Sequence, residues 1–136
     1  MEAGGVARVL VVAYRTAATP ALLDAIRERA GRGPAIFHLL VPNPGEPREA
    51  DHVLALALPL IDEAAGRQVD SSVSPRHDPM DAIEDALREY DFDEIILSTL
   101  PRSVSRWLHI DLPHRVAHLG LPLTTVTAVE RGQDPP

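Results

Sequence analysis

Apolar runs alternate with amphipathic segments along this chain, and that alternation is the strongest constraint on its fold. The first run, RVLVVAY at 8–14, is apolar almost throughout and rich in β-branched residues, as expected of a strand buried on both faces. Further strands are predicted at 34–41, 68–74, 92–99 and 121–129, with the weakly alternating 68–74 stretch at a sheet edge. The order βαβαβαβαβ predicts an α/β fold, a doubly wound five-stranded parallel sheet with helices on both faces.

Local capping signals place two of the intervening helices. Thr19 suits the N-cap of a helix that has Pro20 at its first position and ends at Gly31. The clearest helix lies within residues 77–90, where Asp78 is the expected N-cap and the apolar residues fall on one face.

The other helical segments are less regular. The stretch 53–60 alternates like a strand, and Pro59 would interrupt a helix, yet the apolar residues of 48–65 also fit helical spacing. We predict a helix there, kinked at Pro59, and keep a strand as the alternative. A short amphipathic stretch at 103–110 precedes a final helix at 111–120, with Asp111 as its N-cap.

Composition narrows the class of protein. The 136 residues suggest one domain, 1–136, with a flexible tail from about residue 130. A net charge of −7 argues against a nucleic-acid or anionic-membrane surface, and the absence of cysteine excludes disulfides and thiolate metal sites. The start lacks a signal-peptide pattern, and no apolar run approaches the ~18 residues of a membrane span. A cytoplasmic protein is therefore expected.

Several segments together resemble the universal stress protein family, and in particular a divergent bacterial branch of it. They are VLVVAY near the start, DPMDAIEDAL, FDEIILST, and GLPLTTV near the end. The resemblance covers almost the whole chain. It implies a Rossmann-like, nucleotide-binding type of sheet ordered 3-2-1-4-5, a role in the stress response and usually a dimer. It also implies two subclasses, one that binds ATP and one that does not.

The family's ATP-binding loop, Gly-x2-Gly-x9-Gly-Ser after strand four, is not preserved. Spacing puts its three glycines and its serine at Ser98, Pro101, Asp111 and Leu112. The family's nucleotide-contacting aspartate after strand one corresponds to Tyr14, and only its following serine has a conservative match, Thr16. Glycines let backbone N–H groups approach phosphate oxygens, whereas proline has no N–H and aspartate adds negative charge. ATP and AMP are therefore disfavoured, and no cofactor is expected.

Side chains could still bind an anion in the crevice where the winding of the sheet reverses, between strands one and four. Arginines and hydroxyls gather there and could bind phosphate through side-chain donors. The candidate ligand-binding residues are Tyr14, Arg15, Thr16, Ser98, Thr99, Arg102, Ser103 and Ser105.

A purely structural interpretation of the same loop is favoured over the ligand-binding one, because phosphate-loop matches without glycines have a high false-positive rate. In it, Ser98 and Thr99 cap a turn, Arg102 and Arg106 form a solvated i,i+4 pair, and Trp107 packs against the core.

Metal and enzyme chemistry have little support. His114 and His118 are spaced i,i+4 and are the best metal candidates, with His109 and Asp111 nearby, but no HExxH motif accompanies them. No Gly-x-Ser-x-Gly motif indicates a hydrolase nucleophile. We therefore expect no metal and no catalytic residue, with a nucleotide-processing enzyme as the least favoured reading.

These observations predict a universal-stress-type binding or regulatory module that does not bind ATP in the family manner. The predicted partner is a second copy, because the last strand, at the sheet edge, has neither charge nor proline from Leu123 to Val129. The alternative is a nucleotide or small-anion sensor that uses side-chain donors in the crevice. No nucleic acid or membrane partner is expected.

Overall fold

The computed structural model describes residues 5–42, 47–101 and 105–128. Ten elements follow one another along the chain. They are β1 (Ala7–Val12), α1 (Pro20–Gly31), β2 (Ala35–Pro42), α2 (Pro47–Ala65), β3 (Asp70–Ser74), α3 (Pro79–Glu89), β4 (Glu94–Thr99), α4 (Arg106–His109), α5 (Leu112–Ala117) and β5 (Leu123–Thr127). The flexible tail expected from about residue 130 lies outside the described residues.

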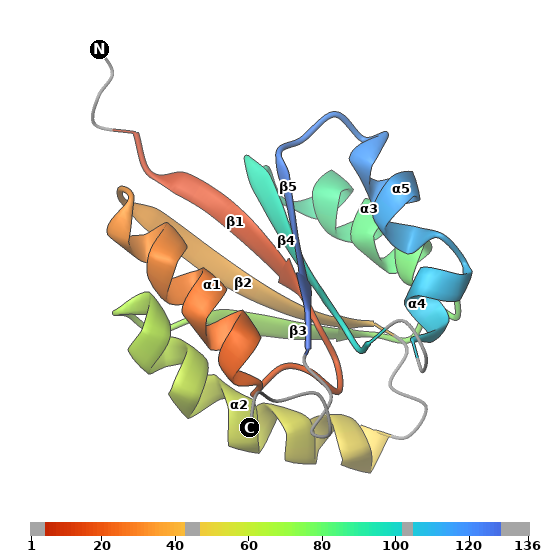
Figure 1. The fold of residues 1–136 in the computed structure, drawn as a ribbon, viewed down its shortest axis with the longest axis horizontal. Helices are drawn as coiled ribbons and strands as arrows, with labels where there is room; N and C mark the ends of the chain where they lie inside the picture. Colours follow the sequence, from red (N-terminus) through yellow and green to blue (C-terminus); the bar gives the residue numbers. More distant parts are fainter. Residues whose placement is uncertain (1–4, 43–46, 102–104, 129–136) are drawn as a thin grey trace, which may run out of the picture.

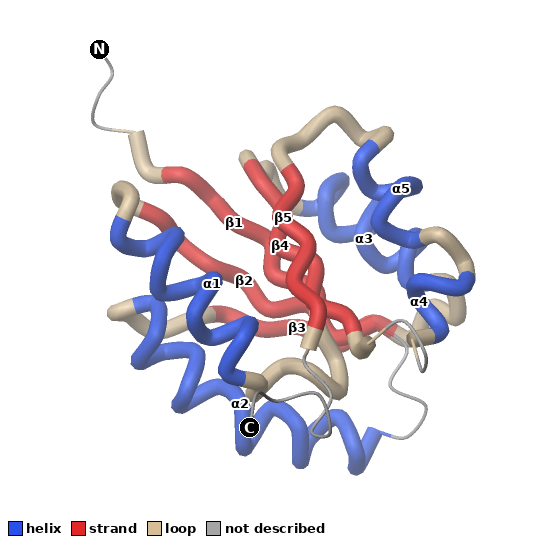
Figure 2. The backbone as a smooth tube through the Cα atoms, in the orientation of Figure 1, coloured by secondary structure: helices blue, strands red, loops and turns tan. Residues whose placement is uncertain are grey.

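The strands form one five-stranded sheet in the order β3-β2-β1-β4-β5, and every neighbouring pair is parallel. Helices α1 and α2 cover one face, and α3, α4 and α5 lie on the other (Figures 1 and 2). The predicted fold class and strand order are confirmed, including β3 at an edge. The winding reverses between β1 and β4, as expected.

The covered part of the central strand β1, Val9 to Val12, shows why its sequence is apolar. Val9 and Val11 point to the α1/α2 face, where they pack with Phe37, whereas Leu10 and Val12 point to the α3/α5 face. All five side chains are fully buried. Successive side chains of a strand alternate between faces, so a strand covered by helices on both sides must be apolar at every position.

Helix α2 settles the ambiguity over 48–65 in favour of the helix. It runs continuously through Pro59, which is exposed, while Ala57 and Ile61 are buried against the sheet. The apolar residues follow the helical period, and this burial outweighs the backbone hydrogen bond lost at proline. The predicted kink at Pro59 stays a prediction.

The predicted N-cap residues all occupy their positions, but only one uses its side chain as expected. The Asp78 carboxylate accepts a hydrogen bond from the backbone N–H of Met80 at 2.9 Å and is bound by the Arg115 guanidinium at 3.0 Å. The Arg115 hydrogen bond is the main cause of a lowered Asp78 pKa. Thr19 and Asp111 precede α1 and α5 without capping them through their side chains, and Asp111 has a left-handed backbone with φ of 59°.

An ion pair ties α1 to the sheet beneath it. Arg29 binds the Glu94 carboxylate through two hydrogen bonds of 2.8 and 2.9 Å, and both side chains are mostly buried. The hydrogen bond to Glu94 is also the main reason that the Arg29 pKa is raised. Such two-point pairing holds geometry as well as charge. None of the described helices is long and apolar enough to cross a bilayer.

Candidate functional site

The candidate site lies where the carboxyl ends of β1 and β4 meet, with Val12 opposite Leu97 in the register. A short turn after β1 carries Tyr14, Arg15 and Thr16 towards the end of β4. Six of the eight predicted ligand-binding residues can be located. Arg102 and Ser103 lie outside the described residues.

Two of the predicted residues are brought together by a direct hydrogen bond. The Thr16 Oγ1 and Ser98 Oγ atoms are 2.6 Å apart, and the two residues are only 2% and 1% exposed. Thr16 also accepts a hydrogen bond at its backbone oxygen from the Thr19 hydroxyl at 2.8 Å. These hydroxyls are therefore committed to joining the turn after β1 to β4.

The next two hydroxyls differ in their surroundings. Ser105 is 2% exposed, and its Oγ accepts a hydrogen bond from the Leu108 backbone N–H at 3.1 Å in the first turn of α4. Thr99 is 1% exposed, and its Oγ1 has no hydrogen-bond partner among the described residues. Its backbone oxygen binds the Ala128 N–H at 2.9 Å. Among the described residues of the crevice, Thr99 is thus the buried hydroxyl for which no hydrogen bond is formed by the side chain.

The charged residue of this turn, Arg15, contacts both a carboxylate and an aromatic ring. Arg15 is exposed, its guanidinium carbon lies 5.6 Å from the centroid of the half-buried Tyr14 ring, and its Nη2 atom is 3.7 Å from the Glu49 carboxylate of α2. Such a contact combines cation–π attraction with an exposed ion pair, each worth about 1 kcal/mol or less.

The structural interpretation of the loop holds only in part. Ser98 bonds Thr16 instead of capping the turn after β4, and Thr99 Oγ1 has no partner among the described residues. The Arg102 and Arg106 side chains lie outside the described residues. Trp107 packs against the cluster between α3, α5 and the sheet, as that interpretation expected. A nucleophilic hydroxyl needs a base within hydrogen-bonding reach, whereas Thr16 and Ser98 are bound to each other. The Thr16 and Ser98 hydroxyls therefore hold the turn after β1 against β4.

The predicted histidine pair is brought together on α5. The rings of His114 and His118 are 4.4 Å apart at their centroids, and the His118 Nδ1 lies 2.8 Å from the His114 backbone oxygen. No third histidine, cysteine or acidic ligand joins a group of metal-binding size within the described residues. The His109 side chain lies outside them.

Sequence reasoning missed a second polar region, on the α3 side of the sheet. A pocket of about 250 Å³ lies over β1, β2 and β3. The lining residues are Arg8, Ile36, Phe37, His38, Asp70, Ser71, Tyr90 and Phe92. One signal was available in the sequence: His38 interrupts an otherwise apolar strand, and two of the few aromatic residues, Tyr90 and Phe92, lie two positions apart.

Known structures with this fold include two universal stress protein structures from Archaeoglobus fulgidus. The first superposes with a TM-score of 0.63 at 18% identity, covering 88% of this chain and 93% of that one. The second, a complex with dAMP, superposes with a TM-score of 0.57 at 17% identity, covering 90% and 98%.

Sequence comparisons add no closer relative. No protein-family model matches the chain, and no curated protein matches it either. At this level of identity the likeness concerns the architecture alone. The chain thus shares the α/β fold of the universal stress proteins, and one protein with that fold binds a nucleotide.

Proposed function

We propose that this chain is a universal-stress-type binding or regulatory module that does not bind ATP in the family manner, catalyses no reaction and acts as a homodimer. One observation carries the proposal about ATP. The Thr16–Ser98 hydrogen bond, fully buried, spans the point between β1 and β4 where a nucleotide phosphate would have to enter.

Binding a nucleotide in that place would carry three costs. The Thr16 and Ser98 hydroxyls would have to exchange their mutual hydrogen bond for the ligand, and Pro101 offers no backbone N–H in the following loop. Arg15 would also have to leave Glu49. A phosphate loop instead presents free N–H groups before the ligand arrives.

Isothermal calorimetry with Mg-ATP tests this proposal, with dAMP as a second titrant. We expect no saturable heat for either nucleotide up to about 1 mM, a range that corresponds to weak binding. A micromolar Kd for either nucleotide would overturn the proposal. Measurable release of phosphate from ATP would overturn its non-enzymatic part.

Thr99 supports a second candidate function, a sensor of small anions. Its hydroxyl is buried and unpartnered among the described residues, and the chain continues from it through Pro101 into the arginine-bearing loop. A buried hydroxyl without a partner costs free energy, and an anion could satisfy it. Titration with inorganic phosphate tests this candidate. Saturable binding that Thr99→Val abolishes, and that the exposed Arg32→Gln control retains, would replace the first proposal.

The homodimer proposal rests on the β5 edge. Ala128 donates its N–H to Thr99 on β4, and Pro122 accepts from Ile95 through its carbonyl oxygen. Backbone groups alternate in direction along a strand, so those of Leu123, Thr125 and Thr127 face away from β4. The edge residues carry no charge, and a second copy paired antiparallel across a two-fold axis would complete their hydrogen bonds.

Because only some backbone N–H groups of β5 face away from β4, proline substitutions there can test the dimer by light scattering. Thr125→Pro removes an outward N–H and should convert a dimer, of about twice the 14.8 kDa chain mass, into a folded monomer. Thr125→Ala keeps the N–H and should stay dimeric. Val126→Pro removes an inward N–H and should also destabilise the monomer. A wild-type chain that is monomeric at high concentration, or a dimer that Thr125→Pro leaves intact, contradicts the proposal.

A further inference from the structure

The pocket missed by sequence reasoning lies on a part of the sheet surface that carries polar, partly exposed side chains. On the α3 side, the apolar cluster over β1 and β4 includes Leu10 and Leu97, which are fully buried. Towards β2 and β3 the same face carries Ile36, which is 38% exposed, and the half-buried His38. The change from apolar to polar residues opens a hollow beside α3.

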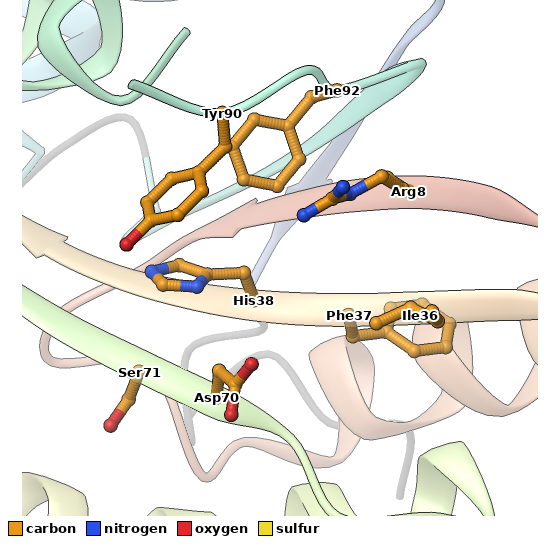
Figure 3. A pocket seen from close by; sticks show the side chains of 8 residues that line it. All are labelled: Arg8, Ile36, Phe37, His38, Asp70, Ser71, Tyr90 and Phe92. Atoms are coloured by element: carbon orange, nitrogen blue, oxygen red, sulfur yellow. The ribbon is translucent and has the colours of Figure 1, made fainter.

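Strand register places the polar side chains of this hollow on one face. Arg8 is paired with Ile36, and His38 is paired with Leu10 on one side and Asp70 on the other. Residues paired across parallel strands point to the same face. Arg8 and Asp70 therefore border the hollow from β1 and β3, with His38 on the strand between them (Figure 3).

Three rings form one side of the hollow. The His38 ring centroid is 5.7 Å from that of Tyr90 and 6.0 Å from that of Phe92, and the last two are 6.2 Å apart. Tyr90 is 42% exposed, so much of this aromatic surface is open to solvent. In Figure 3 the Arg8 side chain extends along β1 towards these rings. A further ring could pack against them edge to face or offset.

The electrostatics of the hollow combine both signs. Neither the Arg8 guanidinium nor the Asp70 carboxylate forms an ion pair with another described residue. The His38 Nε2 is 2.8 Å from the Ser72 hydroxyl. Burial is the main cause of a lowered His38 pKa, so the imidazole is neutral at pH 7. The lining residues thus offer one cation, Arg8, one anion, Asp70, and uncharged rings between and beside them. Nearby, Glu89 acts electrostatically on His38, and the Asp93 carboxylate accepts the Arg8 backbone N–H at 2.8 Å.

We propose that this hollow binds a small zwitterion that carries one aromatic ring, of the chemical class of an aromatic α-amino acid. Arg8 binds its carboxylate, Asp70 binds its ammonium group, and its ring packs against Tyr90 and Phe92. A simple anion would meet the Asp70 carboxylate, and a simple cation would meet Arg8. The volume of about 250 Å³ lies just below the range of drug-sized pockets, which suits a ligand with one ring.

This site is separate from the crevice of the proposed function. Arg8 lies near the start of β1, and Asp70 is the first residue of β3, whereas Thr16 and Ser98 lie at or beyond the carboxyl ends of β1 and β4. A ligand in the hollow and a ligand in the crevice would therefore shift different backbone amides. The two proposals can fail independently.

The test follows backbone amide chemical shifts by NMR while the full chain is titrated with L-phenylalanine. We expect saturable shifts at residues lining the hollow, with a Kd near or below about 1 mM. Three related probes each lack one feature: 3-phenylpropionate lacks the ammonium group, phenethylamine lacks the carboxylate, and L-alanine lacks the ring. Each should bind at least about tenfold more weakly.

Variants assign the roles. Arg8→Gln should abolish saturable binding of L-phenylalanine, while the exposed Arg32→Gln control leaves it unchanged. Asp70→Asn should weaken L-phenylalanine and strengthen 3-phenylpropionate, because the repelling carboxylate is gone. Both altered side chains are exposed, so circular dichroism should show an intact fold. Shifts that do not saturate, that appear instead around Thr16 and Ser98, or that Arg8→Gln and Arg32→Gln affect equally would overturn the proposal.

Discussion

The crevice between β1 and β4 and the hollow over β1, β2 and β3 belong to one sheet but differ in how their polar groups are satisfied. In the crevice, Thr16 and Ser98 bond to each other out of contact with solvent, and Arg15 is paired with Glu49. In the hollow, Arg8 and Asp70 have no ion-pair partner among the described residues.

This difference shows that the place where a fold usually binds ligands need not be the place where its polar side chains are open to a ligand. The fold directs attention to the crevice, since ligands of doubly wound sheets bind where the winding reverses. The Thr16 and Ser98 hydroxyls behave as parts of the core, because a buried hydroxyl usually needs a partner and these two partner each other. Open polar groups beside aromatic rings occur instead in the hollow, where the fold alone gives no reason to look.

The largest effect is expected from breaking the hydroxyl pair in the crevice. Thr16→Val leaves the Ser98 hydroxyl buried without its partner and should lower the free energy of unfolding by about 1–3 kcal/mol. The double variant Thr16→Val with Ser98→Ala removes both polar groups and should regain much of that loss. Urea unfolding of the wild type, both single variants and the double variant measures the coupling. Strictly additive losses would show that the pair is not a structural unit.

A smaller effect, dependent on pH, is expected in the hollow. His38 has a lowered pKa, mainly through burial and also through Arg8, while Asp70 and Glu89 oppose the shift. The unfolded chain therefore takes up this proton before the folded chain does. The stability contribution of neutral His38 is complete above pH 6.5 and is lost as the pH falls from 6.5 through the folded pKa.

Thermal unfolding at pH 8 and at pH 5.5 checks this sign. The wild type should lose more Tm on acidification than His38→Gln, which keeps a hydrogen-bonding group but cannot be protonated. His77→Gln, an exposed position, serves as the comparison for changing a histidine. An equal pH dependence of Tm in the wild type and in His38→Gln would show that His38 does not cause the loss of stability at low pH.

The smallest effect is expected at Thr99, the buried crevice hydroxyl that contrasts with Thr16. Its hydroxyl has no partner among the described residues, so Thr99→Val should change the free energy of unfolding by less than about 0.5 kcal/mol or raise it. Thr16→Val, on the other side of the crevice, has the opposite expectation. A loss at Thr99 as large as that at Thr16 would mean that its hydroxyl is bonded in solution.

Much of the fold could be predicted because its signals are local. Asp78 and Pro79 indicate the start of a helix. The apolar run at 8–14 indicates a strand covered on both faces. The 48–65 segment was harder, since both periods fit it and only packing of Ala57 and Ile61 against the sheet decides. The strand order needed the family resemblance in addition to the alternation.

The site could be predicted only in part, because contacts between distant residues decide what its groups do. The sequence placed Thr16 and Ser98 in one crevice, but their mutual hydrogen bond depends on the spacing of two strand ends. The hollow was missed for a similar reason. Tyr90 and Phe92 lie in a segment with several charged residues, and their contact with His38 exists only after α3 returns the chain to the sheet.

The Thr16–Ser98 hydrogen bond also has a kinetic consequence, because it joins residues separated by 82 positions in sequence. It can form only after the chain has closed a long loop and β4 has docked beside β1, so we expect it to form late in folding. An interaction made after the main barrier is crossed acts on escape from the native state. The two hydroxyls would then slow unfolding, and so lengthen the time the chain stays folded, while leaving the rate of folding largely unchanged.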